Sequence, residues 1–129
     1  MDNISIPASN RTPEISFDFE NHHMRISGES YPEDVTSFYN PLFAALDGYL
    51  STLGNGTARF DRSLIYFNSS SAKAIMMLME RIDDAAAKGA AIDVYWYYDP
   101  EDETMHELGE EFGEDLQSAE FHLEQMPHP

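Results

Sequence analysis

The sequence predicts a mixed α/β fold in which two strands are followed by alternating helices and strands, in the order ββαβαβαβ. Three observations lead to this prediction. Apolar and polar residues alternate near the N-terminus, three stretches have apolar residues at helical spacing, and short apolar runs lie between the helical stretches. Because strands separated by helices favour parallel pairing, we expect a small, mostly parallel mixed sheet with helices packed on it.

The N-terminal part of the chain is predicted to form a hairpin. Residues 1–11 have no periodic pattern, and we expect them to be flexible. Apolar and polar residues alternate over 14–19, and Met24 and Ile26 share one face of a second short run, which is typical of two paired strands. Glycine and proline in the segment 28–34 then predict a turn.

A long helix is predicted over residues 35–53, where apolar residues recur every three or four positions. Pro41 lies inside this pattern, where it removes a backbone donor and its ring clashes with the preceding turn. Either the helix is kinked there, or the main helix starts at Pro41 with Asn40 as its N-cap. The pattern does not choose between these two alternatives. The sequence Gly-Asn-Gly at 54–56 ends the helix.

The second half of the chain alternates between strands and helices. Residues 64–67 are a continuous apolar run, typical of a strand buried on both faces, and we expect this strand to be central in the sheet. A helix from about Ser70 follows, with an apolar stripe that ends near Lys88 and Gly89. The remaining elements are a strand, a helix and a short last strand, predicted over residues 92–98, 101–116 and 121–123.

Composition excludes several classes of protein. The chain has 129 residues, of which 42% are hydrophobic, so we expect one domain with a packed core. Acidic residues number 24 and basic residues 7, a net charge of −17, which argues against nucleic acid or an anionic membrane as partner. The absence of cysteine excludes disulfides and thiol chemistry. With no secretory signal and no apolar run that could span a bilayer, we expect a cytoplasmic protein without membrane insertion.

The acidic residues are concentrated in the last third of the chain. After Lys88 there is no lysine or arginine, whereas aspartates and glutamates are frequent. Solubility is one explanation for this distribution. The other is an acidic face that steers a basic partner protein toward the molecule.

The most informative place is the junction between the strand at 64–67 and the next helix. The sequence Asn-Ser-Ser-Ser at 68–71 follows the strand directly. Helix capping needs only one or two of these side chains, and ligands or partners of open α/β sheets are commonly met at this edge. A serine here would lie near free backbone amides and the positive end of a helix, where a phosphate can be accommodated. Structural capping and a modified or reactive serine both remain open.

Other chemistry has less support. A serine hydrolase requires a base and an orienting acid, but the five histidines stand in no recognisable motif and the nucleophile elbow is absent. Acidic residues over 99–110 fall loosely on calcium-loop positions, yet Thr104 replaces the glycine that such a loop requires. We therefore expect no catalytic residues, no metal site and no cofactor.

Four segments of the chain resemble the SiaC family of bacterial regulatory phosphoproteins. They are GESYPE at 28–33, LIYFNSSSAKA at 64–74, WYYD at 96–99 and GEEFGED at 109–115. The segments occur in the family's order, and the resemblance covers most of the chain, from about Thr12 to the last strand.

The resemblance implies a fold like that of anti-sigma-factor antagonist (STAS) domains and a non-enzymatic switch protein. In the family, a dedicated kinase phosphorylates the hydroxyl residue after the junction asparagine, and a PP2C-type phosphatase removes the phosphate. The unmodified form binds and activates a diguanylate cyclase, which raises cyclic di-GMP and favours aggregation or biofilm. The phosphoacceptor maps to Ser69, where serine replaces the family's threonine, with Ser70 and Ser71 as alternatives.

The predicted partner surface combines the start of the second long helix with the turn before the first. Its residues are Ser30, Tyr31, Pro32, Glu33, Asn68, Ser70 and Lys73. Two other functions remain possible, an interaction module that is never modified and a small enzyme that uses the serines at 69–71.

Overall fold

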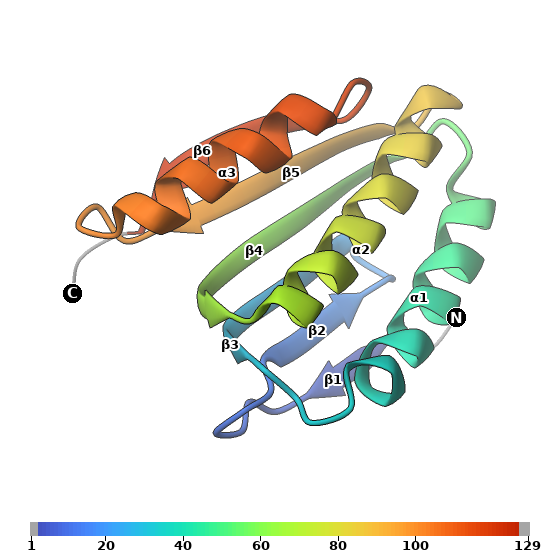
Figure 1. The fold of residues 1–129 in the computed structure, drawn as a ribbon. Coiled ribbons are helices and arrows are strands. Elements are labelled where there is room, and N and C mark those ends of the chain that lie inside the picture. Colours follow the sequence, from blue (N-terminus) through green and yellow to red (C-terminus); the bar gives the residue numbers. More distant parts are fainter. Residues whose placement is uncertain (1–2, 127–129) are drawn as a thin grey trace.

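The computed structural model describes residues 3–126 as one mixed sheet with helices packed against it (Figure 1). In chain order the elements are β1 (Ile4–Ile6), β2 (Glu14–Asp18), β3 (His23–Ser30), α1 (Val35–Leu53), β4 (Thr57–Phe67), α2 (Ser69–Ala87), β5 (Ala91–Tyr98), α3 (Glu103–Asp115) and β6 (Glu120–Gln125). The predicted mixed α/β class is confirmed. No helix within this part of the chain is long and apolar enough to cross a membrane.

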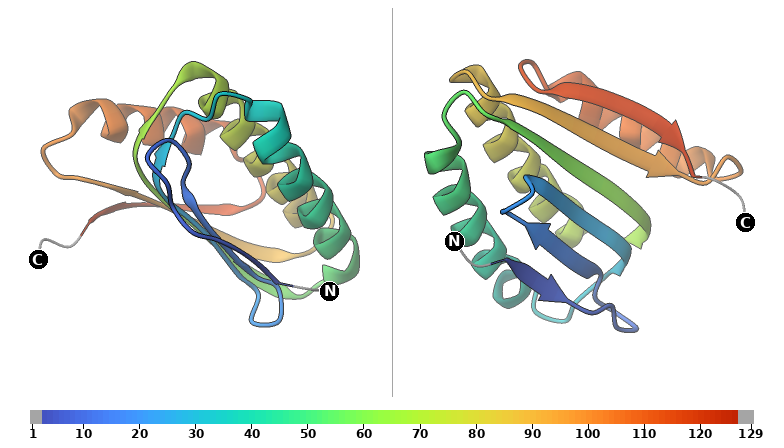
Figure 2. Two further views of the ribbon diagram at one scale, coloured as in Figure 1. Left: turned by 90° about the horizontal axis from the view of Figure 1, so that it is seen from below. Right: turned by 180° about the vertical axis from the view of Figure 1, so that it is seen from behind.

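The sheet has six strands in the order β1-β2-β3-β4-β5-β6. The pairs β1–β2 and β2–β3 are antiparallel, whereas β3, β4, β5 and β6 run parallel to one another. The three helices lie on the same side of the sheet, and the view from behind shows the strands uncovered (Figure 2). The molecule therefore has two layers, and the parallel strands expose one face.

The core lies between the sheet and the helices. Its largest fully buried apolar side chains come from every layer and include Phe17, Met24, Ile26, Phe60, Trp96, Leu42, Leu46 and Ile75. Alternation along the strands places the buried strand side chains on the side that the helices cover. The polar strand residues therefore occupy the uncovered face.

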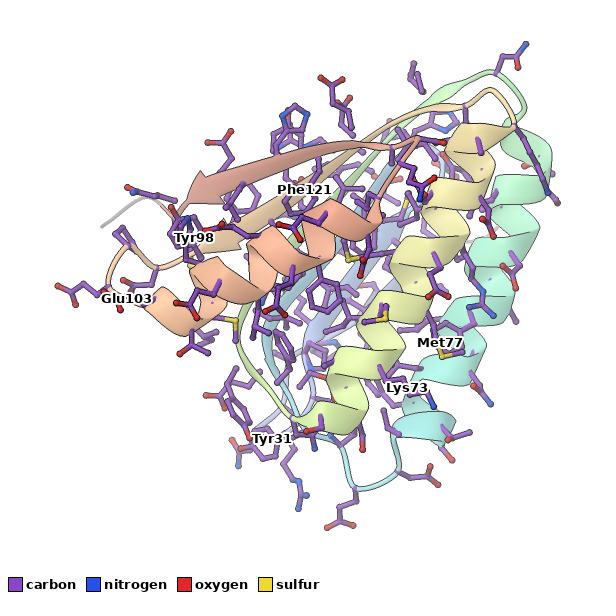
Figure 3. The ribbon with its side chains drawn as sticks, turned by 45° about the horizontal axis from the view of Figure 1, so that its top comes forward. Tyr31, Lys73, Met77, Tyr98, Glu103 and Phe121 are labelled. Atoms are coloured by element: carbon purple, nitrogen blue, oxygen red, sulfur yellow. The ribbon has the colours of Figure 1, made fainter. Side chains whose placement is uncertain are left out.

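Two glycines of α3 allow this helix to approach the sheet closely. A Cβ atom at Gly109 would lie 2.6 Å from Leu123 and 2.7 Å from the indole nitrogen of Trp96. A Cβ atom at Gly113 would lie 2.6 Å from the ring of Phe121, which lies beside α3 (Figure 3). The GEEFGED segment is therefore explained by packing of α3 on β5 and β6.

The N-terminal region contains one strand more than predicted. Residues 4–6 form β1 on the edge of the sheet, paired with Ile15–Phe17 of β2. The expectation that residues 1–11 contain no structure is therefore wrong for this segment. Three residues are too few to establish an alternating pattern, and the strand is defined by pairing with β2, which sequence periodicity does not report.

The first three residues of the predicted turn, Gly28 to Ser30, belong to strand β3. β3 continues to Ser30 through a register shift between Gly28 and Glu29, with Gly28 at φ +106°. The register skips Ile65, so the extra residue of this bulge lies on β4. Gly28, whose positive φ is readily adopted by glycine, lies opposite the bulge within β3 rather than at its end.

Helix α1 is continuous across Pro41 and begins at Val35. Asp34 is its N-cap, because the Asp34 carboxylate accepts a hydrogen bond from the Ser37 backbone amide at 3.0 Å. The alternative in which the main helix starts at Pro41 with Asn40 as cap is therefore wrong.

Strand β4 is longer than predicted and lies between β3 and β5, as expected. However, its pairing with β5 ends at Arg62 and its last residues pair only with β3. Ile65 and Tyr66 consequently remain 54% and 49% exposed. The prediction that residues 64–67 are buried on both faces is wrong, since the helices cover only one face and β5 does not flank this end of the strand.

Candidate functional site

The start of α2 is defined by Asn68, which directly follows β4. The Asn68 backbone is extended, and its side-chain oxygen accepts a hydrogen bond from the Ser71 amide at 2.9 Å. Asn68 is thus the N-cap, and Ser69 is the first residue of a 19-residue helix. The side chains of Ser69 and Ser70 are exposed to solvent, so either hydroxyl can be reached by a partner protein.

Ser71 differs from its two neighbours because its side chain is completely buried. Its hydroxyl lies 2.9 Å from that of Ser30 on β3, which lies 2.6 Å from the hydroxyl of Tyr39 on α1. Burial raises the pKa of the Tyr39 hydroxyl, although its serine partners act in the opposite direction. These three hydroxyl groups join α1, α2 and β3 directly beneath the exposed serines.

This burial corrects two of the candidate site residues. Ser71 is not accessible to a kinase in this conformation, and the Ser30 side chain is fully buried and does not contribute to a partner surface. The hydrogen-bond partners of Ser30 are other hydroxyl groups rather than a histidine or carboxylate, so this cluster supplies no general base for serine catalysis.

The turn after β3 lies beside the start of α2. The Asn68 amide donates to the Ser30 carbonyl oxygen at 3.1 Å, which connects the two segments. The Tyr31 ring meets the Tyr66 ring edge-on at 5.7 Å. Figure 3 shows Tyr31 below the first turn of α2 and Lys73 on the side of α2 that faces α1. The structure therefore brings together the two segments that were expected to form one surface.

Arg11 holds this turn from the other side. Its guanidinium lies 5.4 Å from the centre of the Tyr31 ring and donates a hydrogen bond to Glu33 at 3.1 Å. The Arg11 carbonyl oxygen also accepts from the Tyr31 amide at 2.7 Å. Glu33 is exposed and Pro32 is half-buried, so the turn presents both at the surface.

Lys73 lies one helical turn after Ser69 and lines a groove between α1 and α2. The groove also contains Val35, Tyr39, Ser70 and Met77. The Lys73 side chain is exposed, and its ammonium group lies within reach of groups bound near Ser69.

The exposure of Ile65 and Tyr66 near the end of β4 was not predicted. They are two of the three large apolar side chains that the structure leaves exposed within residues 3–126. The sequence gives no direct signal for this, because the end of strand pairing at Arg62 depends on the register with β5. Tyr66, through its contact with Tyr31, joins Ser69, Ser70 and Lys73 in what we call the switch surface, whereas Ile65 lines a hollow with Asp99 and the residues that follow β5.

An acidic cluster lies away from this surface, on the uncovered face of the sheet. Ligand atoms of Asp93, Glu120 and His122 all lie within 4.8 Å of one another. His122 is already hydrogen-bonded to Asp93 at 2.9 Å and stacks on Tyr95 with ring centres 4.4 Å apart. These contacts explain the cluster as a hydrogen-bonded pair between β5 and β6 that is supported by stacking.

The fold and the switch surface define a small α/β protein with an exposed hydroxyl at the start of a helix. The model of the SiaC family regulatory phosphoproteins matches residues 6–126, so the chain belongs to the SiaC family.

Individual relatives agree with this assignment. An uncharacterized protein of Pseudomonas aeruginosa strain UCBPP-PA14 is 31% identical over 115 residues, covering 89% of this chain and 90% of the relative. The crystal structure of apo-SiaC from Pseudomonas aeruginosa has a TM-score of 0.88 at 30% identity, covering 96% of this chain and 99% of that one.

A further structure contains a partner. In the crystal structure of the diguanylate cyclase SiaD in complex with its activator SiaC from Pseudomonas aeruginosa, the matching chain has a TM-score of 0.89 at 30% identity. The similarity covers 95% of this chain and 99% of that SiaC chain. In Pseudomonas aeruginosa, a protein with this fold therefore binds a diguanylate cyclase.

Proposed function

We propose that this protein is a non-enzymatic, cytoplasmic regulator that is switched by phosphorylation of Ser69. The unmodified form binds and activates a diguanylate cyclase, a dedicated kinase adds the phosphate and a PP2C-type phosphatase removes it. The observation that carries this proposal is the exposed Ser69 hydroxyl at the first position of α2. The SiaC–SiaD complex supports the class of effector.

The local geometry favours a phosphate on Ser69 without loss of the fold. A phosphate brings roughly 1.5 to 2 negative charges, which is a small change for a chain with a net charge of −17. At the positive end of α2, a negative charge is favoured by about 0.3 to 1 kcal/mol. We therefore expect the modified protein to remain folded.

The effect on a partner is different. The rings of Tyr31 and Tyr66 lie in the two segments that the Asn68–Ser30 hydrogen bond joins, and a partner that packs on these rings and on Ser69 would exclude water from this end of α2. The phosphate carries up to two negative charges and Lys73 supplies one positive charge, so part of the phosphate charge would be buried unpaired, which costs several kcal/mol. Phosphorylation should accordingly release the cyclase.

The site is tested by mapping the phosphate. Protein from its native cells is digested, and the peptide that contains residues 69–71 is sequenced by mass spectrometry. We expect one phosphate, on Ser69. The purified kinase should modify Ser70→Ala but not Ser69→Ala protein. Phosphate that persists on Ser69→Ala protein would contradict the assignment.

A further inference from the structure

A second candidate binding surface lies between α2 and α3. Its lining consists of four apolar side chains and four carboxylates, namely Met76, Met79, Phe112, Leu116, Glu80, Asp83, Asp84 and Asp115. The two helices converge toward their C-terminal ends and separate toward their N-terminal ends (Figure 1). Met76 is 39% exposed, so the apolar floor of this groove reaches solvent. We call this feature the acidic groove.

The narrow end of the acidic groove is held in place by Asp83. Its carboxylate accepts hydrogen bonds at 2.8–3.2 Å from the backbone amides of Gln117, Ser118 and Ala119. Partial burial raises the pKa of Asp83, but the three amides outweigh it and keep the pKa below its ordinary value. Asp83 is thus an ionised structural contact that fixes the loop after α3 against α2.

The remaining carboxylates of the groove lie close to other negative charges. Glu80 and Asp115 have no lysine or arginine among the residues that line the groove, whereas Asp84 also lines the neighbouring pocket beside Arg81 and Lys88. Asp115 is the last residue of α3, and this last turn contains no basic residue. The C-terminal end of a helix carries partial negative charge and favours cations, so carboxylates at this position repel both it and one another. A cationic partner would relieve this repulsion.

We propose that the acidic groove binds a basic amphipathic helix of a partner protein. Apolar side chains of that helix would pack on Met76 and Phe112, and its lysines or arginines would reach Glu80 and Asp115. Methionine side chains suit such a surface because they adapt to different apolar partners. A second copy of this chain is not a suitable occupant, because its net charge is also −17. The surface is distinct from the switch surface and does not depend on phosphorylation.

A designed peptide tests the chemistry of this surface. The probe is a fluorescein-labelled 18-residue amphipathic helix of leucine and lysine, titrated with the full chain at 0.15 M salt and followed by anisotropy. The reference peptide has the same composition in an order without an apolar face. We expect the amphipathic peptide to bind at least about fivefold more tightly, a difference of about 1 kcal/mol.

Matched variants separate the groove from general acidity. The groove variant combines Glu80→Gln, Asp84→Asn and Asp115→Asn, whereas the control combines Glu101→Gln, Glu107→Gln and Glu111→Gln. Both remove three charges, but none of the control positions lines the groove. The groove variant should bind the amphipathic peptide at least about fivefold more weakly, and the control should change affinity by less than about twofold.

Two further measurements keep the test independent of folding. Thermal melts should show that both triple variants unfold as cooperatively as the parent chain. Met76→Gln removes an apolar contact without changing the charge, and this variant should also bind the amphipathic peptide more weakly. Equal weakening by the groove and control variants, or equal affinity for the two peptides, would show that only overall acidity attracts the probe and would overturn the proposal.

Discussion

Three buried hydroxyl groups hold the exposed serines in position. Ser30, Tyr39 and Ser71 each lie on a different element, and all three side chains are inaccessible to solvent. A buried hydroxyl that loses its partner costs about 1–3 kcal/mol. The position of the first turn of α2 relative to α1 and β3 therefore depends on this small network.

The network can be tested by removing one oxygen. Tyr39→Phe removes the Tyr39 hydroxyl but leaves Ser30 bonded to Ser71. We expect the free energy of unfolding to fall by about 1 kcal/mol, measured by urea denaturation. Tyr66→Phe is the control, because the Tyr66 ring is 49% exposed, and its effect should stay within about 0.5 kcal/mol. A neutral Tyr39→Phe would show that the network does not stabilise the fold.

Lys73 is the residue of the switch surface whose charge can be reversed most cleanly. It is exposed and lies one helical turn from Ser69. Lys73→Glu should weaken binding of the kinase or the cyclase by about tenfold, while the melting temperature of the protein changes little. Lys88→Glu at the opposite end of α2 is the matched control. If Lys73→Glu leaves both interactions intact, the switch surface has been placed wrongly.

At the scale of elements, helices were easier to predict than strands. Apolar spacing identified all three helices, because each has one face on the sheet. The burial of Ser71 was also readable in principle, since it lies three and four residues before Ala74 and Ile75 on the same buried stripe. By contrast, β1 and the exposed end of β4 depend on pairing between distant segments, which a local pattern does not contain.

Arg62 shows a second limit of local patterns. Alternation places it on the helix side of β4, where its guanidinium lies 3.6 Å from the Trp96 ring and donates to two backbone carbonyl oxygens. Burial lowers its pKa to about 9, although Asp102 acts in the opposite direction. Residue type alone predicts that Arg62 is exposed, because arginine is rarely buried without a carboxylate partner.

The packing of α3 gives a prediction about this element. Gly109→Ala adds a methyl group 2.6 Å from Leu123, so the helix must move away from β5 and β6. Alanine is intrinsically the better helix former by about 1 kcal/mol, but overpacking typically costs about 1–3 kcal/mol. We expect a lower melting temperature for Gly109→Ala, whereas Glu111→Ala on the exposed side of α3 should leave it unchanged or raise it. A more stable Gly109→Ala protein would contradict close packing of α3.

At the scale of the whole molecule, net charge is the dominant feature. A charge of −17 on 129 residues produces repulsion between surface carboxylates that opposes the compact state. Salt screens this repulsion, with a screening length that falls from about 30 Å at 0.01 M to about 10 Å at 0.1 M. The acidic C-terminal part of the chain should therefore be more stable at physiological salt than in dilute buffer.

This effect is measured by thermal melts at 0.01 M and 0.3 M sodium chloride. We expect the melting temperature to rise with salt, and to rise less for a variant that combines Glu80→Gln, Asp84→Asn and Asp115→Asn. A melting temperature that falls with salt would mean that attractive ion pairs outweigh the repulsion.

The central claim is that one phosphate on Ser69 controls the binding of a cyclase to a folded protein. The most direct measurement is a titration of the cognate diguanylate cyclase with unmodified and with singly phosphorylated protein at one ionic strength, following both affinity and cyclic di-GMP synthesis. Ser69→Ala, Ser69→Asp and the remote charge control Asn55→Asp complete the series, with a thermal melt of each. The unmodified, Ser69→Ala and Asn55→Asp proteins should bind and activate, whereas the phosphorylated and Ser69→Asp proteins should bind at least about tenfold more weakly with unchanged melting. Equal affinity and activation by the unmodified and phosphorylated proteins would contradict the claim, and loss of the melting transition on phosphorylation would show that the charge acts by unfolding the protein.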